Sequence, residues 1–174
     1  MTVPSNVLAR LDARDRALFL RWSMVEDGTL SRACWVALTH LGGVSCSVAA
    51  ALIPIRLGGA VGLAAQRALA VLVISHVVVQ LVKRTVGRPR PSRSTNCRTL
   101  VQEPDRFSFP SGHSAAAMSV AIVYAFAFPS LAAVLIPLAV LVGASRVCLG
   151  VHYPGDVLIG QMIAVLTAIP FVAG

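Results

Sequence analysis

Long uncharged stretches alternate with short charged ones along this chain. No charged residue occurs from Ala33 to Ile55, and a second uncharged run, Ala68 to Val82, follows a softer apolar lead-in from Leu57 to Gln66. A helix rises about 1.5 Å per residue, so the first run can cross the hydrocarbon core of a bilayer, and the second can do so with its lead-in. The pattern predicts membrane-spanning helices.

The uncharged run from Ser114 to Ser145 is too long for one crossing. A single helix of that length would reach about 48 Å, whereas the hydrocarbon core is about 30 Å thick. Phe128-Pro129-Ser130 lies near its middle and predicts a tight hairpin between two spans. Val157 to Gly174 can form the last crossing. We therefore expect an all-α, polytopic membrane bundle of about five spans, forming one domain over residues 1–174.

The N-terminal segment has a different pattern. Residues 5–27 carry charges every few positions, so they form no span and no cleavable secretory signal. Their apolar residues recur near helical spacing, which predicts an amphipathic helix lying at the membrane interface; a poorly ordered tail is the alternative. These apolar residues are Leu8, Leu11, Leu18, Trp22 and Val25.

Composition strengthens the membrane interpretation. The chain is 56% hydrophobic and 13% charged, more apolar than a soluble domain of 174 residues can bury. Its net charge of +8 suits anionic lipid headgroups or a phosphate site. Nucleic acid is disfavoured because the long basic loop has only Phe107 and Phe109 as aromatic residues. The cysteines lack zinc-site spacing, and we interpret them as small buried side chains: Cys34, Cys46, Cys97 and Cys148.

Three polar blocks lie at the ends of predicted spans: Lys83–Pro91, Pro110–His113 and Ser145–Asp156. A loop joins the first block to the second, and two crossings separate the second from the third. All three therefore fall on the same side of the membrane. Without the hairpin at Phe128-Pro129, the second and third blocks would face opposite sides.

The second block suits an anion site. Ser111 is a good helix N-cap, and the first turn that follows presents free N–H groups and the positive end of the helix dipole. His113 lies in that turn and would face the same anion. In the third block, Asp156 comes four residues after His152. Its carboxylate can contact the imidazole, fix the tautomer and leave the other ring nitrogen free to attack.

Basic residues of the first and third blocks can supply the charge that phosphoryl transfer requires. Lys83, Arg90 and Arg146 would stabilise a phosphoryl transition state where no Mg²⁺ is present. Arginine adds two parallel donors for phosphate oxygens. His40 and His76 lie within predicted spans and outside the blocks, and we interpret them as ordinary polar residues.

The three blocks resemble the signature of the type 2 phosphatidic acid phosphatase (PAP2) superfamily: Lys-x6-Arg-Pro, Pro-Ser-Gly-His and Ser-Arg-x5-His-x3-Asp. Every signature position is filled between residues 83 and 156. Many membrane members have six spans, with three before the first motif, whereas we count two here. The chain is thus similar to the compact, five-span bacterial members, which implies an integral protein of the bacterial plasma membrane.

The resemblance also implies a role for each residue. His152 would attack phosphorus and form a phosphohistidine, Asp156 would orient His152, and His113 would protonate the leaving oxygen. It implies no metal and no cofactor. The phosphate oxygens would be held by Lys83, Arg90, Ser111, the Gly112 amide and Arg146.

By resemblance, the expected activity is hydrolysis of a phosphomonoester or pyrophosphate on a membrane lipid. The substrates to consider are a polyprenyl pyrophosphate, phosphatidic acid or phosphatidylglycerol phosphate, and a polyprenyl-phosphoryl sugar phosphate. A catalytically inactive membrane protein that binds or transports phosphorylated lipids is the alternative. Basic residues favour a cytoplasmic site and the resemblance an extracytoplasmic one, so the side stays open. A homo-oligomer is compatible with the sequence.

Overall fold

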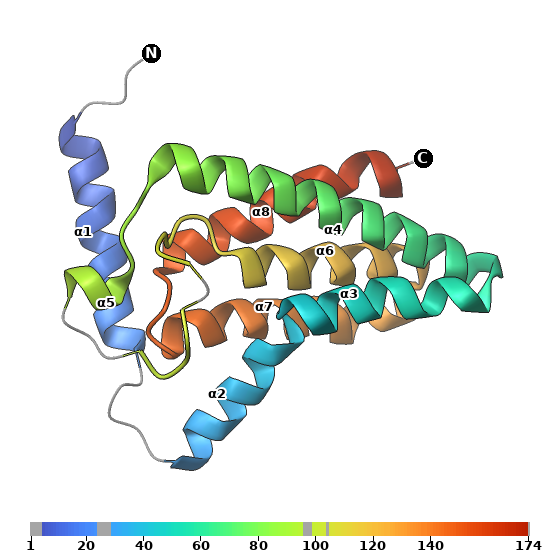
Figure 1. Cartoon of the computed structure of the whole chain (residues 1–174), viewed down its shortest axis with the longest axis horizontal. Coiled ribbons are helices and arrows are strands. Elements are labelled where there is room, and N and C mark those ends of the chain that lie inside the picture. The colour runs from blue at the N-terminus through green and yellow to red at the C-terminus, as the bar shows by residue number, and fades with distance from the viewer. Residues whose placement is uncertain (1–4, 24–28, 96–98, 104, 174) are drawn as a thin grey trace.

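In the computed structural model, the chain forms a helical bundle with one further helix across its end (Figure 1). The structure describes residues 5–23, 29–95, 99–103 and 105–173, with side chains from residue 12 onward except at position 29. The regular elements among these residues are helices: α1 (Ser5–Trp22), α2 (Thr29–Leu41), α3 (Val44–Leu52), η1 (Ile53–Leu57), α4 (Gly59–Val86), α5 (Pro91–Ser94), α6 (Gly112–Ala127), η2 (Pro129–Leu131), α7 (Ala132–Cys148) and α8 (Pro154–Val172).

Three helical segments are long and apolar enough to cross a membrane: α4, α8 and the continuous segment Pro129–Cys148. The pair α2 and α3 qualifies as a fourth if it counts as one bent span, and α6 is apolar but shorter. The prediction of an all-helical membrane protein is therefore confirmed. The predicted hairpin is also present, because α6 ends at Ala127 and Pro129 begins the next helical segment.

The first predicted span is not one straight helix. α2 and α3 meet at Gly42-Gly43 with a bend of 46°. A side chain at Gly42 would collide with α6 and α7, because its Cβ would lie 2.8 Å from the His113 carbonyl oxygen and 2.5 Å from Val142. Glycine at this position therefore lets the break in the helix approach the first turn of α6.

α6 lies at the centre of the bundle and contacts α4, α7 and α8 most extensively. Small residues such as Ala51, Ala68 and Ala168 dominate the core next to it and allow close helix contact. Polar side chains link the helices where lipid supplies no hydrogen-bond partner. The Ser75 and Ser119 hydroxyls join α4 to α6 at 2.8 Å.

One prediction about side chains is wrong. Cys34 and Cys46 are exposed rather than buried, because the bundle does not cover them, and Cys46 lines an open apolar pocket. Cys148 is buried, and Cys97 lies outside the described residues. α1 uses Phe19, which is fully buried, to contact the bundle, whereas Leu18 and Trp22 are exposed. Val25 lies outside the described residues.

Gly160 brings α8 against the second polar block. A Cβ at this position would lie 2.5 Å from the Ser111 carbonyl oxygen. We expect Gly160→Ala to force the two segments apart, at a cost of about 1–3 kcal/mol in the free energy of unfolding. Thermal unfolding in detergent measures this, with exposed Leu158→Ala on the same helix as the control. An unchanged melting temperature for Gly160→Ala would contradict the packing.

Candidate active site

The C-terminal end of α4 delivers the first cationic side chains. Gly87 caps the helix at a positive φ of 62°, a conformation that glycine adopts without strain, and turns the chain towards Arg90. Lys83 is buried in the last turn, and its Nζ donates to Asp105 Oδ2 at 3.0 Å. Arg90 is fully buried, and its Nη1 lies 3.3 Å from His152 Nε2. Arg90 therefore lies directly beside the imidazole, and Asp105 links Arg90 to Lys83.

The N-terminus of α6 contributes the second block. Ser111 occupies the N-cap position but makes no side-chain cap, which differs from the expectation. Its hydroxyl instead accepts a hydrogen bond from Ser114 Oγ at 2.8 Å. The N–H groups of the first turn are therefore left without a side-chain cap, and Gly112 and His113 line a cavity there.

Arg146, in the last turn of α7, is buried with unpaired donors. Its Nη1 donates to Thr39 Oγ1 at 2.6 Å. Its Nε and Nη2 have no hydrogen-bond partner among the described residues. A buried guanidinium with unsatisfied N–H groups is costly, and an anion with several acceptor oxygens would satisfy them. Arg146 is therefore suited to an anionic ligand.

His152 and Asp156 lie side by side at the turn into α8. His152 Nδ1 is 3.5 Å from Asp156 Oδ2, and that oxygen also accepts the Tyr153 N–H at 2.9 Å. Pro154 begins α8, as expected. Burial lowers the pKa of His152 to about 4, against the opposing effect of Asp156, so the imidazole is neutral at pH 7. With Nδ1–H towards the carboxylate, the tautomer we assign leaves a lone pair on Nε2.

A cavity of about 260 Å³ lies beside His152. Of the predicted site residues, Lys83, Arg90 and His152 line it, as do Gly112 and His113. The remaining three, Ser111, Arg146 and Asp156, do not line the cavity and are completely or almost completely buried. Sequence reasoning missed the other lining residues, which are Gly42, Val44, His76, Gln80 and Asp105.

Asp105 is the most strongly bonded of the missed residues. Its carboxylate accepts hydrogen bonds from Lys83 Nζ and from Arg90 Nη2 at 2.9 Å. Burial acts to raise the pKa of Asp105, but these two cations outweigh it, so the pKa is lowered and the side chain is ionised. The sequence could not single out Asp105, because Glu103 is another acidic residue of the same loop. In the structure, Glu103 accepts a hydrogen bond from Ser92 Oγ instead.

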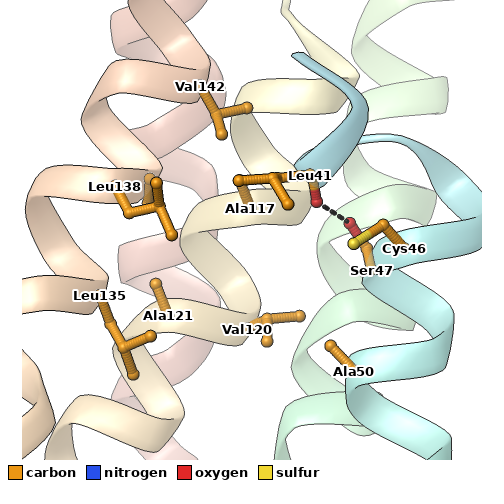
Figure 2. Close-up of a pocket in the computed structure, with 11 residues that line it drawn as sticks. Leu41, Cys46, Ser47, Ala50, Ala117, Val120, Ala121, Leu135, Leu138 and Val142 are labelled. Atoms are coloured by element: carbon orange, nitrogen blue, oxygen red, sulfur yellow. Dashed lines mark hydrogen bonds between the residues drawn. The ribbon is translucent and has the colours of Figure 1, made fainter. Parts of the chain in front are cut away.

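An apolar pocket of about 170 Å³ lies next to this cavity (Figure 2). Leu41 and Ser47, on either side of the α2–α3 break, line the pocket, and the Ser47 hydroxyl donates to the Leu41 carbonyl at 3.5 Å. Leu135 and Val142 of α7 form its opposite wall in Figure 2. Gly42, the residue after Leu41, lines the catalytic cavity, so the walls of both cavities include residues at the α2–α3 break.

Relatives with known names share part of this chain. It is 35% identical over 109 residues to the lipid A 1-phosphatase of Rhizobium johnstonii, covering 58% of this chain and 45% of that protein. It is 38% identical over 89 residues to the decaprenylphosphoryl-5-phosphoribose phosphatase of Mycobacterium tuberculosis, covering 50% of this chain and 48% of that protein. The matched region thus spans about half the length of these curated relatives.

Solved structures match almost the whole chain. A PAP2 type phosphatidylglycerolphosphate phosphatase from Bacillus subtilis aligns with a TM-score of 0.76 and 27% identity, over 95% of this chain and 85% of that one. Aquifex aeolicus LpxE aligns with a TM-score of 0.79, over 91% and 94% of the two chains, and at 23% identity it bears on the fold alone. The PAP2 superfamily model matches residues 64–173, which include all three polar blocks. This chain belongs to the PAP2 superfamily.

Proposed function

We propose that this protein is a metal-independent phosphatase that hydrolyses a phosphomonoester or pyrophosphate on a membrane lipid. One observation carries the proposal: a buried, neutral imidazole lies among three buried cationic side chains, and one of these, Arg146, has two unpaired nitrogens. A phosphoryl group fits this arrangement, because its oxygens would accept the free N–H groups while phosphorus faces the imidazole. The other two cations are Lys83 and Arg90.

In the first step, His152 Nε2 attacks phosphorus. The P–N bond forms as the bond from phosphorus to the leaving oxygen breaks. His113, protonated when the anionic phosphate offsets the nearby cations, donates a proton to that oxygen. Asp156 stabilises the positive charge on the imidazole. The phosphate is held by Lys83, Arg90, Arg146, Ser111 and the Gly112 amide.

In the second step, water attacks the phosphohistidine. His113, now neutral, accepts a proton from the water as the new P–O bond forms and the P–N bond breaks. Inorganic phosphate leaves, and His152 and His113 return to their initial protonation states. The charge that a metal would otherwise supply comes from the three basic side chains, so the cycle uses no cofactor.

The proposed membrane arrangement has five crossings: the bent pair α2–α3, followed by α4, α6, α7 and α8. α6 is short, about 24 Å at 1.5 Å per residue, and it packs against α4, α7 and α8 at the centre of the bundle. α1 would lie at the interface with its exposed Leu18, Leu20 and Trp22 towards lipid. Residues 1–174 would then act as one unit in a bacterial plasma membrane.

The apolar pocket beside the catalytic cavity supports a lipid substrate, because a hydrocarbon chain can enter it while the phosphate reaches His152. The names of the relatives point the same way, since lipid A, decaprenylphosphoryl-5-phosphoribose and phosphatidylglycerol phosphate all join a phosphate to a lipid. The substrate belongs among polyprenyl pyrophosphate, phosphatidic acid or phosphatidylglycerol phosphate, and polyprenyl-phosphoryl sugar phosphates.

Phosphate release from a panel of these lipids in detergent, with excess EDTA, tests the function. We expect activity to be unchanged by EDTA and inhibited by vanadate, which adopts the trigonal-bipyramidal geometry of the transition state. Loss of activity in EDTA would contradict the metal-independent mechanism. No release from any lipid would indicate instead an inactive protein that binds or transports phosphorylated lipids.

A further inference from the structure

Arg88 contacts the catalytic carboxylate, although it is not a residue of the family signature. Its Nη1 donates to Asp156 Oδ1 at 2.7 Å. The same nitrogen donates to Asp15 Oδ2, and Nη2 donates to Asp12 Oδ1, each at 2.7 Å. The guanidinium also lies over the Tyr153 ring, 4.0 Å from its centroid. Arg88 therefore joins α1 to the turn that carries His152.

α1 contacts this turn directly as well. Asp15 Oδ1 accepts the Gly155 N–H at 2.7 Å, in the first turn of α8. A Cβ at Gly155 would lie 2.8 Å from Asp15 Oδ2, so glycine permits this close approach. Phe19 packs edge-on against Tyr153, with ring centroids 5.3 Å apart. These contacts hold α1 across the end of the bundle, where Figure 1 shows it.

We propose that α1 is part of the active site, because Arg88 and Asp15 are positioning residues that hold Asp156 against His152 and set the charge around the imidazole. This inference rests on the proposed function. Both oxygens of Asp156 accept a hydrogen bond. Oδ1 accepts one from Arg88, and Oδ2, the oxygen nearer to His152, accepts one from the Tyr153 N–H. Without Arg88, the carboxylate can rotate away from Nδ1, and its buried charge loses its nearest cation.

The charges give the proposal a specific signature. Arg88 is one positive charge beside Asp156, and Asp12 and Asp15 partly neutralise it. Arg88→Gln leaves three carboxylates without this cation, which should raise the pKa of His152. Asp15→Asn removes one of the carboxylates that neutralise Arg88, which should lower the pKa of His152. The other charged or titratable groups around the imidazole are the same in every variant: Lys83, Arg90, Asp105, His113 and Arg146.

Because a neutral His152 is the nucleophile, its titration appears in the acidic limb of kcat/KM against pH. We expect Arg88→Gln to lower kcat by about tenfold or more and to move this limb to higher pH. Asp15→Asn should move the limb to lower pH. Arg88→Lys keeps the charge but loses the paired donors, so kcat should fall without a shift of the limb. General structural damage would not move the two limbs in opposite directions.

The experiment measures kcat/KM from about pH 2.5 to 9 on phosphatidic acid, or on the lipid of the panel that gives the highest wild-type rate. The phosphate of the substrate titrates equally in all variants and cancels. Arg84→Gln is the control, since Arg84 is exposed near the same end of α4 and should change nothing. Thermal unfolding shows whether each variant folds. If Arg88→Gln does not fold, Asp15→Asn and Asp12→Asn carry the test, because both are predicted to move the limb to lower pH.

An inactive wild-type protein would overturn the proposed function, not the role of α1 specifically. An active wild type whose acidic limb stays unchanged in the folded variants would overturn this inference alone. So would limbs that move in the same direction in Arg88→Gln and Asp15→Asn. Opposite shifts, with Arg84→Gln unchanged, would establish α1 as part of the site.

Discussion

His152→Ala is expected to lower kcat by at least about a hundredfold, the largest effect of any substitution considered for this protein. The substitution removes the nitrogen that attacks phosphorus, and His113 does not replace it, because its proposed role lies on the leaving-group side. The cations that bind phosphate remain, so substrate binding should change much less than kcat. Phosphate release in EDTA, measured against substrate concentration, separates the two effects.

His40→Ala is the matched control, since His40 is exposed on α2 and lines no part of the catalytic cavity. It should retain the wild-type rate. A second measurement examines the intermediate: acid-quenched protein should carry radiolabelled phosphate in the wild type and none in His152→Ala. Equal rates in the two proteins, or a labelled phosphoenzyme that persists in His152→Ala, would assign the nucleophile to another residue.

Arg146→Met should give the second largest effect, a loss of about a hundredfold in kcat/KM together with weaker vanadate binding. The substitution removes the two unpaired donors that would contact phosphate oxygens. The stability of the folded protein should not fall with the activity, because methionine fills similar space without burying an unpaired charge. The melting temperature of the ligand-free protein should therefore be unchanged or higher.

Thr39→Val is the control for this prediction, since Thr39 Oγ1 is the acceptor for Arg146 Nη1. It removes that partner and leaves the cation in place, so the loss of vanadate affinity should be much smaller. Wild-type vanadate affinity in Arg146→Met would show that this arginine does not bind the phosphate. A strongly lowered melting temperature would show that Arg146 mainly stabilises the bundle.

Most helices of the bundle could be predicted because they depend on local sequence. The hairpin at Pro129 and the start of α8 at Pro154 follow from the fixed φ of proline and its missing N–H. The meeting of the three polar blocks follows from counting crossings. Such features need only an apolar run of sufficient length and a residue that ends or begins a helix.

The missed features depend instead on contacts between distant segments. The bend at Gly42 arises where α2 and α3 approach His113, and an uncharged run gives no sign of that contact. Asp105 and Arg88 are charged residues in a loop that carries many, and only the folded chain shows which of them reach Lys83 or Asp156. The exposure of Cys34 and Cys46 is not predictable either, because composition does not say which side chains the bundle covers.

The contact between α1 and Arg88 bears on where the functional unit of this protein begins. The family match starts at residue 64, whereas the carboxylates that bond Arg88 come from Asp12 and Asp15. A fragment cut at the start of the match would keep every signature residue and lose the partners of the guanidinium beside Asp156. A complete signature in a truncated or fused chain is therefore no guarantee of a working enzyme.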